Sequence, residues 1–239
     1  MNSFDVNILS FLNQFAQKSQ VIDSIIVLLA YNDLLKGGIV IALLWWAYYH
    51  PTENKLFNRE YIIPTATICC ASAMFVTRAL AFTLPFRERP LNTPEFQFNL
   101  PSATLRDTLI PWSSFPSDHA ALFFALATGI YFSSRLVGAF VFSYVCVAIC
   151  FPRLYAGIHW PTDIIIGALI GVVTACLGNI SSIRNSANNL SSEWLKKSPG
   201  SFHACFFLWT YQTATLFKGA RDIASVAYHA LRVIPSGFR

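Results

Sequence analysis

Two polar motifs bracket the apolar stretch that decides the fold of this chain. The first motif reads FPSDH (115–119), and the second reads RLYAGIHWPTD (153–163). The sequence between them is mostly apolar and is long enough for two membrane crossings. A third polar motif, RERP (87–90), lies a short distance upstream. Because ionisable groups are costly in so apolar a chain, their gathering at these three places indicates one shared functional site.

The composition indicates an integral membrane protein. Of the 239 residues, 54% are hydrophobic and only 12% are charged, about half the charged fraction of an ordinary soluble domain. We therefore predict an all-α fold, a polytopic bundle of transmembrane helices. The net charge of +5 is modest, and basic clusters in such a chain mark cytoplasmic loops, so no nucleic acid partner is expected.

The apolar runs predict five membrane spans and a possible sixth. The five are residues 34–50, 61–84, 118–132, 136–151 and 160–177. Residues 202–217 form either an interfacial helix or the sixth span. An amphipathic helix over 4–18 is expected to lie in the membrane interface. Residues 21–31 are too short to span, and Asp33 is placed to cap the helix that follows.

Loop charges orient the predicted bundle. Five spans place the 85–117 and 152–160 loops on one membrane face, which a shared site requires. Six basic residues then fall on the opposite face, which the positive-inside rule makes cytoplasmic: Lys55, Arg59, Arg135, Arg184, Lys196 and Lys197. The prediction is a multi-pass protein of the cell inner (plasma) membrane whose site faces the extracytoplasmic side.

His159 and Asp163 have the spacing of a nucleophile and its orienting group. Pro161 favours the first turn of a helix, so His159 lies just before that turn and Asp163 one turn on. The carboxylate can accept a hydrogen bond from one ring nitrogen and leave the other free to attack. The alternative is an interfacial histidine beside a helix-start aspartate.

The FPSDH motif suits an anion-binding helix start. Ser117 is a plausible N-cap, and the following N–H groups and the helix dipole favour a bound anion. His119 stands at the same helix mouth, although the pattern alone also fits a simple cap.

Arg89 and Arg153 each lie beside the mouth of a span. Guanidinium groups match phosphate oxygens in pairs, although a single arginine there could merely snorkel to lipid headgroups. Two arginines, two histidines, a serine and an aspartate on one face can together bind a phosphoryl group, attack it and protonate its leaving group.

These motifs resemble those of the type 2 phosphatidic acid phosphatase (PAP2) superfamily, which read K-x6-R-P, P-S-G-H and S-R-x5-H-x3-D. Arg89-Pro90 matches the end of the first motif, and FPSDH matches the second. Arg153, His159 and Asp163 match the third at the correct spacing. The resemblance covers about residues 20–178.

Three positions depart from the family pattern. Phe82 takes the place of the first-motif lysine, and Arg78 or Arg87 could supply the missing charge. Pro152 replaces the third-motif serine. Asp118 replaces glycine, which keeps a backbone N–H for phosphate but brings a negative charge near an anion site.

The resemblance implies a two-step reaction. His159 attacks phosphorus to form a phosphohistidine while Asp163 orients its ring, and His119 protonates the leaving oxygen and then activates water. Arg89, Arg153, Ser117 and the Asp118 N–H hold the phosphoryl oxygens. The family implies no metal and no cofactor.

The resemblance also implies a domain division and a substrate class. Residues 1–180 form the phosphatase domain, with interfacial helices over 1–33, and residues 181–239 form a tail. The expected partners are the bilayer and a lipid phosphate or diphosphate, most closely undecaprenyl diphosphate; the residues leave the oligomeric state open. Alternatives are a phosphatidate or phosphatidylglycerophosphate phosphatase, a lipid phosphotransferase, a vanadium-dependent haloperoxidase (disfavoured because those are soluble), and a non-catalytic channel, transporter or scaffold.

Overall fold

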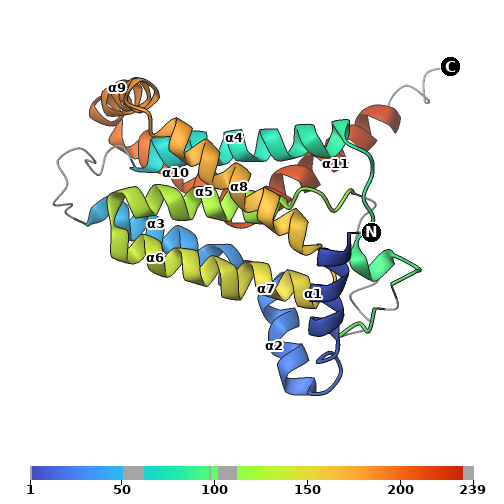
Figure 1. The fold of residues 1–239 in the computed structure, drawn as a ribbon. Helices are drawn as coiled ribbons and strands as arrows, with labels where there is room; N and C mark the ends of the chain where they lie inside the picture. Colours follow the sequence, from blue (N-terminus) through green and yellow to red (C-terminus); the bar gives the residue numbers. More distant parts are fainter. Residues whose placement is uncertain (1, 51–61, 97, 102–111, 234–239) are drawn as a thin grey trace.

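A computed structural model describes residues 2–50, 62–96, 98–101 and 112–233, and within these ranges the only regular elements are helices. Its longer helices lie side by side in one bundle, and α1 and α2 lie across one end of it (Figure 1). Of the basic residues used above for orientation, Lys55 and Arg59 lie outside the described residues. The predicted all-α bundle is confirmed.

Helix α5 (Asp118–Ser133) forms the centre of the bundle. It packs against α8 (Pro161–Gly178), α4 (Ile62–Thr83) and α6 (Arg135–Tyr144). Its side chains are buried on every side, as expected for a helix that is apolar all round. The fully buried members include Ala120, Ala121, Leu122, Phe123, Ala125 and Ala127.

Glycines on α8 allow close packing against α5. A Cβ on Gly171 would lie 2.2 Å from the Ala121 carbonyl oxygen, and one on Gly167 would lie 2.4 Å from that of Ser117. Only a residue without a side chain permits this approach. The starts of α5 and α8, which carry two of the three motifs, are thereby held together.

The membrane spans differ from the prediction in number. Among the residues that the structure describes, three helices are long and apolar enough to cross a membrane: Pro64–Thr83, Arg135–Tyr155 and Pro161–Gly178. A fourth candidate is the pair Gln20–Tyr31 and Leu34–Tyr49, bent by 66° at the break between them. The predicted span over 118–132 does form a helix, but α5 has only 16 residues. Five spans are therefore not confirmed.

The helix of the first predicted span begins in a different way from the one that the sequence predicts. A π-helical turn, η1 (Leu34–Gly38), leads into α3 (Ile39–Tyr49). The Asn32 side chain accepts the Leu35 N–H at 3.0 Å. Asp33 makes no capping hydrogen bond, because its carboxylate pairs with Lys36 at 2.6 Å. The prediction that Asp33 caps this helix was wrong.

The fourth predicted span continues further than expected. Helix α6 runs through the π-helical segment η5 (Val145–Cys150) into α7 (Phe151–Tyr155). Arg153 therefore lies in the last helical turn and not in a loop. Pro152 comes directly after the π-helical segment inside this continuous helix, where a proline removes one backbone hydrogen bond to the preceding turn.

The N-terminal helices pack onto the bundle. Helix α1 (Ser3–Asn13) lies against α7 and α8, and α2 (Gln20–Tyr31) lies against α7. The buried residues of α1 are Asp5, Leu9 and Asn13, which are spaced at one helical turn and include two polar groups. The inward face of α1 is therefore partly polar, whereas a purely interfacial helix would turn apolar residues inward.

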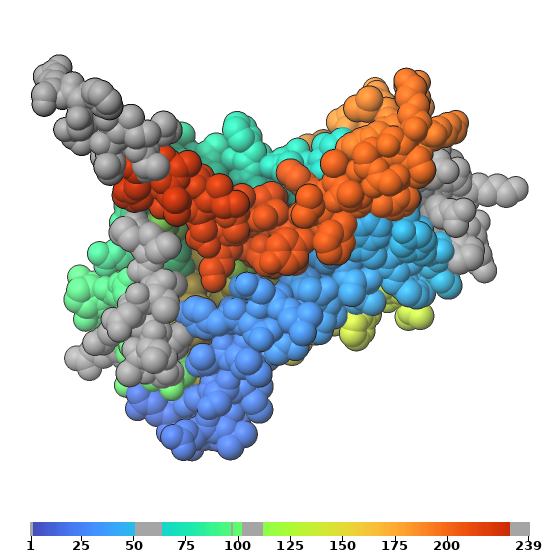
Figure 2. All heavy atoms as spheres, turned by 180° about the vertical axis from the view of Figure 1, so that it is seen from behind, coloured from blue at the N-terminus to red at the C-terminus, as the bar shows by residue number. Residues whose placement is uncertain are grey.

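The C-terminal segment forms three helices: α9 (Ser181–Lys197), α10 (Pro199–Ala214) and α11 (Lys218–Val233). Helix α10 packs against α3, α4 and α9. From behind, the orange α10 borders the blue segment formed by η1 and α3 (Figure 2). With 16 residues, α10 is not among the helices long enough to count as candidate spans.

Candidate active site

The three sequence motifs meet at the end of the bundle where α5 and α8 begin (Figure 1). The backbone N–H of Ser117 donates to the carbonyl oxygen of Asp163 at 3.0 Å, which joins the second motif to the third. The Arg89 side chain donates to the Ile158 carbonyl at 2.9 Å, which joins the first motif to the third. The structure thus brings together residues that lie far apart in sequence.

His159 is held in one tautomer. Its Nδ1 lies 2.9 Å from the carbonyl oxygen of Ser114. A carbonyl can only accept a hydrogen bond, so Nδ1 carries the proton and Nε2 keeps its lone pair. The Asp163 carboxylate lies 3.6 Å from the same Nδ1. The main-chain carbonyl of Ser114, which sequence reasoning did not identify, therefore shares with Asp163 the orientation of this ring.

The Asp163 side chain is completely buried, and both of its carboxylate oxygens accept hydrogen bonds. One carboxylate oxygen accepts the Trp160 backbone N–H at 2.8 Å, which caps the start of α8. The other oxygen accepts from Arg87 at 2.5 Å. The second terminal nitrogen of Arg87 donates to Asp5, also at 2.5 Å. Arg87 is thus occupied by two carboxylates and is poorly placed to bind phosphate.

His119, at the start of α5, is also held by a neighbouring aspartate. Asp118 Oδ1 lies 2.9 Å from both the backbone nitrogen and the Nδ1 of His119. Asp118 Oδ2 accepts from Arg78 at 2.6 Å. The negative charge of Asp118 is therefore paired with Arg78, and its carboxylate orients the His119 ring. Asp118 lies beside His119 and pairs with Arg78. In the same way, Asp163 lies beside His159 and pairs with Arg87.

Ser117 caps α5, as the sequence predicts. Its hydroxyl oxygen accepts the Ala120 N–H at 3.4 Å, and its side chain is buried. The hydroxyl hydrogen is not used in this contact, so it can still donate to an oxygen of a bound anion.

Arg89 and Arg153 differ from the other two arginines of the site. Within the part of the chain that the structure describes, neither has a carboxylate at ion-pair distance. Arg153 is 4% exposed. The Nε of each is buried and has no hydrogen-bond partner among the described residues. Because buried donors without partners are unfavourable, these two guanidinium groups are suited to an anionic ligand.

Burial lowers the pKa of His159 below its usual range; the hydrogen bond to Asp163 acts in the opposite direction. The ring is therefore neutral at pH 7, as a nucleophile must be. Burial also lowers the pKa of Arg89, although Asp118 and Asp163 favour its charged form. Arg89 remains a cation at neutral pH.

Two charged residues of the site region escaped the sequence analysis. Asp5 reaches the site from α1. Lys36, buried in the break between α2 and α3, interacts electrostatically with Arg153 and His119. The sequence carries a signal for each of them. Asp5 is a carboxylate on the same helical stripe as Leu9, and Lys36 is a lone lysine in an apolar run.

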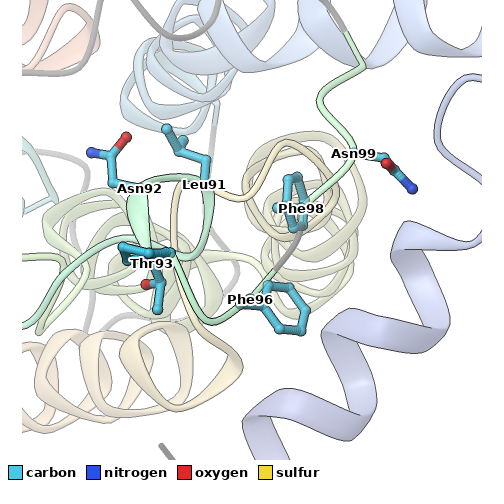
Figure 3. A pocket seen from close by; sticks show the side chains of 7 residues that line it. Leu91, Asn92, Thr93, Phe96, Phe98 and Asn99 are labelled. Carbon is cyan, nitrogen blue, oxygen red and sulfur yellow. The ribbon is translucent and has the colours of Figure 1, made fainter.

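A small pocket opens beside His159. Its lining includes Arg78, Ser113, Pro116 and Asp118. A larger pocket lies in the connecting segment over residues 91–99, where Phe96 and Phe98 form one side (Figure 3). None of the histidines or arginines of the three motifs lines that second pocket. Of these two pockets, only the one beside His159 borders catalytic candidates. Its volume of about 20 Å³ is that of about one water molecule, so a phosphoryl group would require neighbouring side chains to move.

The same side chains could also hold a metal ion. Asp118, His119 and His159 bring three donor atoms within 4.8 Å of one another, and a carboxylate with two imidazoles is a donor set that suits Zn²⁺. Both oxygens of Asp118 are already engaged by His119 and Arg78, so a metal would have to displace these contacts. The expectation of a metal-free site remains a prediction.

Two histidines, each beside an aspartate, and two arginines that pair with no carboxylate among the described residues lie at one end of an apolar helical bundle, as expected for a membrane-embedded phosphatase. The model of the PAP2 superfamily matches residues 62–186, which contain all three motifs. The chain belongs to this superfamily and is an enzyme of the phosphatase class.

Of the named relatives, YbjG carries a phosphatase name and BcrC carries the name of a transport permease. The chain is 25% identical over 177 residues to the Escherichia coli K12 protein YbjG, whose name designates it a candidate undecaprenyl-diphosphatase; the match covers 74% of this chain and 81% of YbjG. It is 36% identical over 63 residues to the bacitracin transport permease protein BcrC of Bacillus licheniformis, which covers 26% of this chain and 30% of BcrC. The crystal structure of Aquifex aeolicus LpxE is similar with a TM-score of 0.54 and 25% identity, covering 74% of this chain and 95% of LpxE.

Proposed function

We propose that the protein hydrolyses the terminal phosphate of a membrane lipid diphosphate through a phosphohistidine, and that undecaprenyl diphosphate is its preferred substrate. One observation carries the proposal. Among the described residues, Arg89 and the buried Arg153 have no carboxylate at ion-pair distance, and they belong to the same site as a neutral histidine whose Nε2 keeps its lone pair. The name of YbjG supports the choice of lipid.

In the first step Nε2 of His159 attacks phosphorus, and the bond from phosphorus to the bridging oxygen breaks. His119, whose pKa burial lowers and Asp118 raises, is protonated with the help of the bound anionic phosphates and gives its Nε2 proton to the leaving lipid phosphate. Asp163 stabilises the positive charge that develops on the His159 ring, and Asp118 orients the His119 ring. Arg89 and Arg153 hold the phosphoryl oxygens, whose charge spreads in the transition state.

In the second step His119 takes a proton from water. The resulting hydroxide attacks phosphorus, the P–N bond breaks, and inorganic phosphate leaves. His119 is then protonated and His159 neutral, as at the start. The cycle needs no redox partner and consumes one water molecule.

The proposed side of the membrane is extracytoplasmic. The site lies where α5 and α8 begin, whereas Arg135 begins α6 after the far end of α5, and Arg184 lies in α9 beyond the end of α8. This separation supports placing the site opposite the basic, cytoplasmic face. A membrane-impermeant thiol reagent tests it: a cysteine at Asn92 should be labelled in intact cells, and one at Asn189 on α9 should not.

A competition panel tests the substrate. Purified protein in EDTA is offered prenyl diphosphate, phosphatidate and phosphatidylglycerophosphate together, and released phosphate is assigned to each. We expect the prenyl diphosphate to have the largest kcat/KM. A preference for phosphatidate or phosphatidylglycerophosphate would assign the enzyme to those lipids. Transfer of phosphate to an added alcohol in place of water would make it a phosphotransferase.

The covalent intermediate has its own test. Rapid quenching in alkali with a ³²P-labelled substrate should trap label on His159, because phosphohistidine is stable to alkali and labile to acid. Loss of activity in EDTA that added Zn²⁺ restores would contradict the metal-free mechanism and indicate a metal at Asp118, His119 and His159.

A further inference from the structure

Asp5 is a buried carboxylate outside the family motifs. It lies in α1 and is 0% exposed. Oδ1 accepts the backbone N–H of Thr162 at 2.9 Å, and Oδ2 accepts the Thr162 hydroxyl at 2.7 Å. Burying a carboxylate is costly unless it is paired and hydrogen-bonded. Both oxygens are satisfied here by the first turn of α8, the helix that carries Asp163.

Arg87 connects Asp5 to Asp163. One terminal nitrogen of Arg87 donates to Asp5 Oδ2 at 2.5 Å, and the other donates to Asp163 Oδ1 at 2.5 Å. The second nitrogen also donates to the Thr162 hydroxyl at 2.7 Å. A planar guanidinium with fixed donor directions holds two carboxylates at a defined separation. Asp5, Arg87, Asp163 and His159 thus form a continuous series of contacts.

Asp5 also affects the net charge beside the His159 ring. If Arg87 paired with Asp163 alone, it would neutralise the Asp163 carboxylate. Because Arg87 is shared between two carboxylates, the group keeps one net negative charge. That charge can stabilise the positive imidazole that forms when His159 bonds to phosphorus.

We propose that Asp5 is a positioning residue for the reaction. It holds Arg87 and Thr162, which fix the carboxylate of Asp163 and through it the ring of His159. Helix α1 is on this view a part of the active site and more than an attachment to the membrane. The inference rests on the proposed roles of His159 and Asp163.

The test compares Asp5→Asn with Asn13→Ala in the full-length protein. Asn13 lies on the same buried face of α1 and holds it to Asn99 through two backbone contacts away from the motifs, at 2.8 and 2.9 Å. We expect Asp5→Asn to lower kcat at least about tenfold while KM stays within about twofold, because loss of orientation acts on the chemical step. Asn13→Ala should lower the melting temperature and leave the kcat of the folded protein unchanged. Equal kcat values for wild type and Asp5→Asn would overturn the proposal.

A double-mutant cycle separates positioning from a general structural effect. If Asp5 acts through Asp163, adding Asp5→Asn to Asp163→Asn should cause little further loss of kcat. If the double variant lost kcat by the product of the two single-variant factors, the proposal would be overturned. Should Asp5→Asn fail to fold, Thr162→Val keeps the carboxylate and removes the hydroxyl link, and it should still lower kcat; an unchanged kcat would again overturn it. Absence of turnover in the wild type would instead count against the proposed function.

Discussion

The backbone N–H of Ser117 donates to the carbonyl oxygen of Asp163 at 3.0 Å. This single bond joins the turns that begin α5 and α8, and it fixes the distance between the two catalytic candidates. Because Gly167 allows the two backbones to approach at the same place, the relative position of His119 and His159 depends on main-chain contacts more than on side-chain packing.

Removing either catalytic histidine should abolish turnover. We expect His159→Ala and His119→Ala each to reduce kcat by about three orders of magnitude or more, because one removes the nucleophile and the other the proton donor. Phosphate release from the lipid substrate measures this. His203→Ala is the matched control, since His203 lies on α10 and contacts Pro199 and Tyr48. Retained activity in either catalytic variant would contradict the mechanism.

The four arginines of the site should fall into two classes. Arg153→Gln should weaken competitive inhibition by orthovanadate by about tenfold to a hundredfold, because charged hydrogen bonds contribute about 1.5–3 kcal/mol. Arg78→Gln should lower kcat with a much smaller effect on vanadate, because Arg78 acts through Asp118. Arg135→Gln, at the start of α6, serves as the control. Equal loss of vanadate binding in Arg78→Gln would show that Arg78 replaces the missing first-motif lysine.

On the acid side, kcat/KM should begin to fall only at a pH below the usual pKa range of histidine. His159 must be neutral to attack, so kcat/KM falls as the pH drops through its pKa, which burial lowers. Asp163 raises this pKa, so Asp163→Asn should move the acid limb to still lower pH while reducing kcat about a hundredfold. A pH series of kcat/KM for both proteins tests the sign. A shift to higher pH in the variant would contradict the assignment.

Removing the charge of Lys36 should weaken binding of a diphosphate more than that of a monophosphate. Lys36 is buried, pairs with Asp33 at 2.6 Å and interacts electrostatically with Arg153. Its ammonium can still add to the positive field that a second phosphate meets, although Asp33 offsets part of it. We expect Lys36→Met to raise KM for the diphosphate by the larger factor. Lys18→Met is the control, because Lys18 packs over the Phe15 ring in the segment after α1. Equal changes for both substrates would count against a role in diphosphate selection.

A methyl group at Gly171 should separate α5 from α8. Its Cβ would lie 2.2 Å from the Ala121 carbonyl oxygen, and such overpacking costs about 1–3 kcal/mol. Gly171→Ala should therefore lower the melting temperature in detergent and reduce activity. Gly200→Ala is the matched control, since nothing lies within 4 Å of that position. An unchanged melting temperature for Gly171→Ala would show that the helices can move apart without loss.

The sequence by itself determined the helical class and the family motifs of the site. Hydropathy depends only on local composition, so the helices over 62–83 and 161–178 were predicted within a few residues. Motif spacing likewise identified the histidines, because Pro161 and Ser117 set helix starts by local backbone chemistry.

Only the tertiary structure decided how the charges pair. The motifs single out Arg89 and Arg153, but the roles of all four arginines, including Arg78 and Arg87, depend on which carboxylates lie nearby in space. Asp5 belongs to the site because α1 folds back onto α8. Asp5 and Thr162 lie 157 residues apart in the chain, so no local pattern encodes their contact. The number of spans also depended on the fold: α5 is short and buried by its neighbours, whereas a hydropathy count assumes that every apolar helix crosses the bilayer by itself.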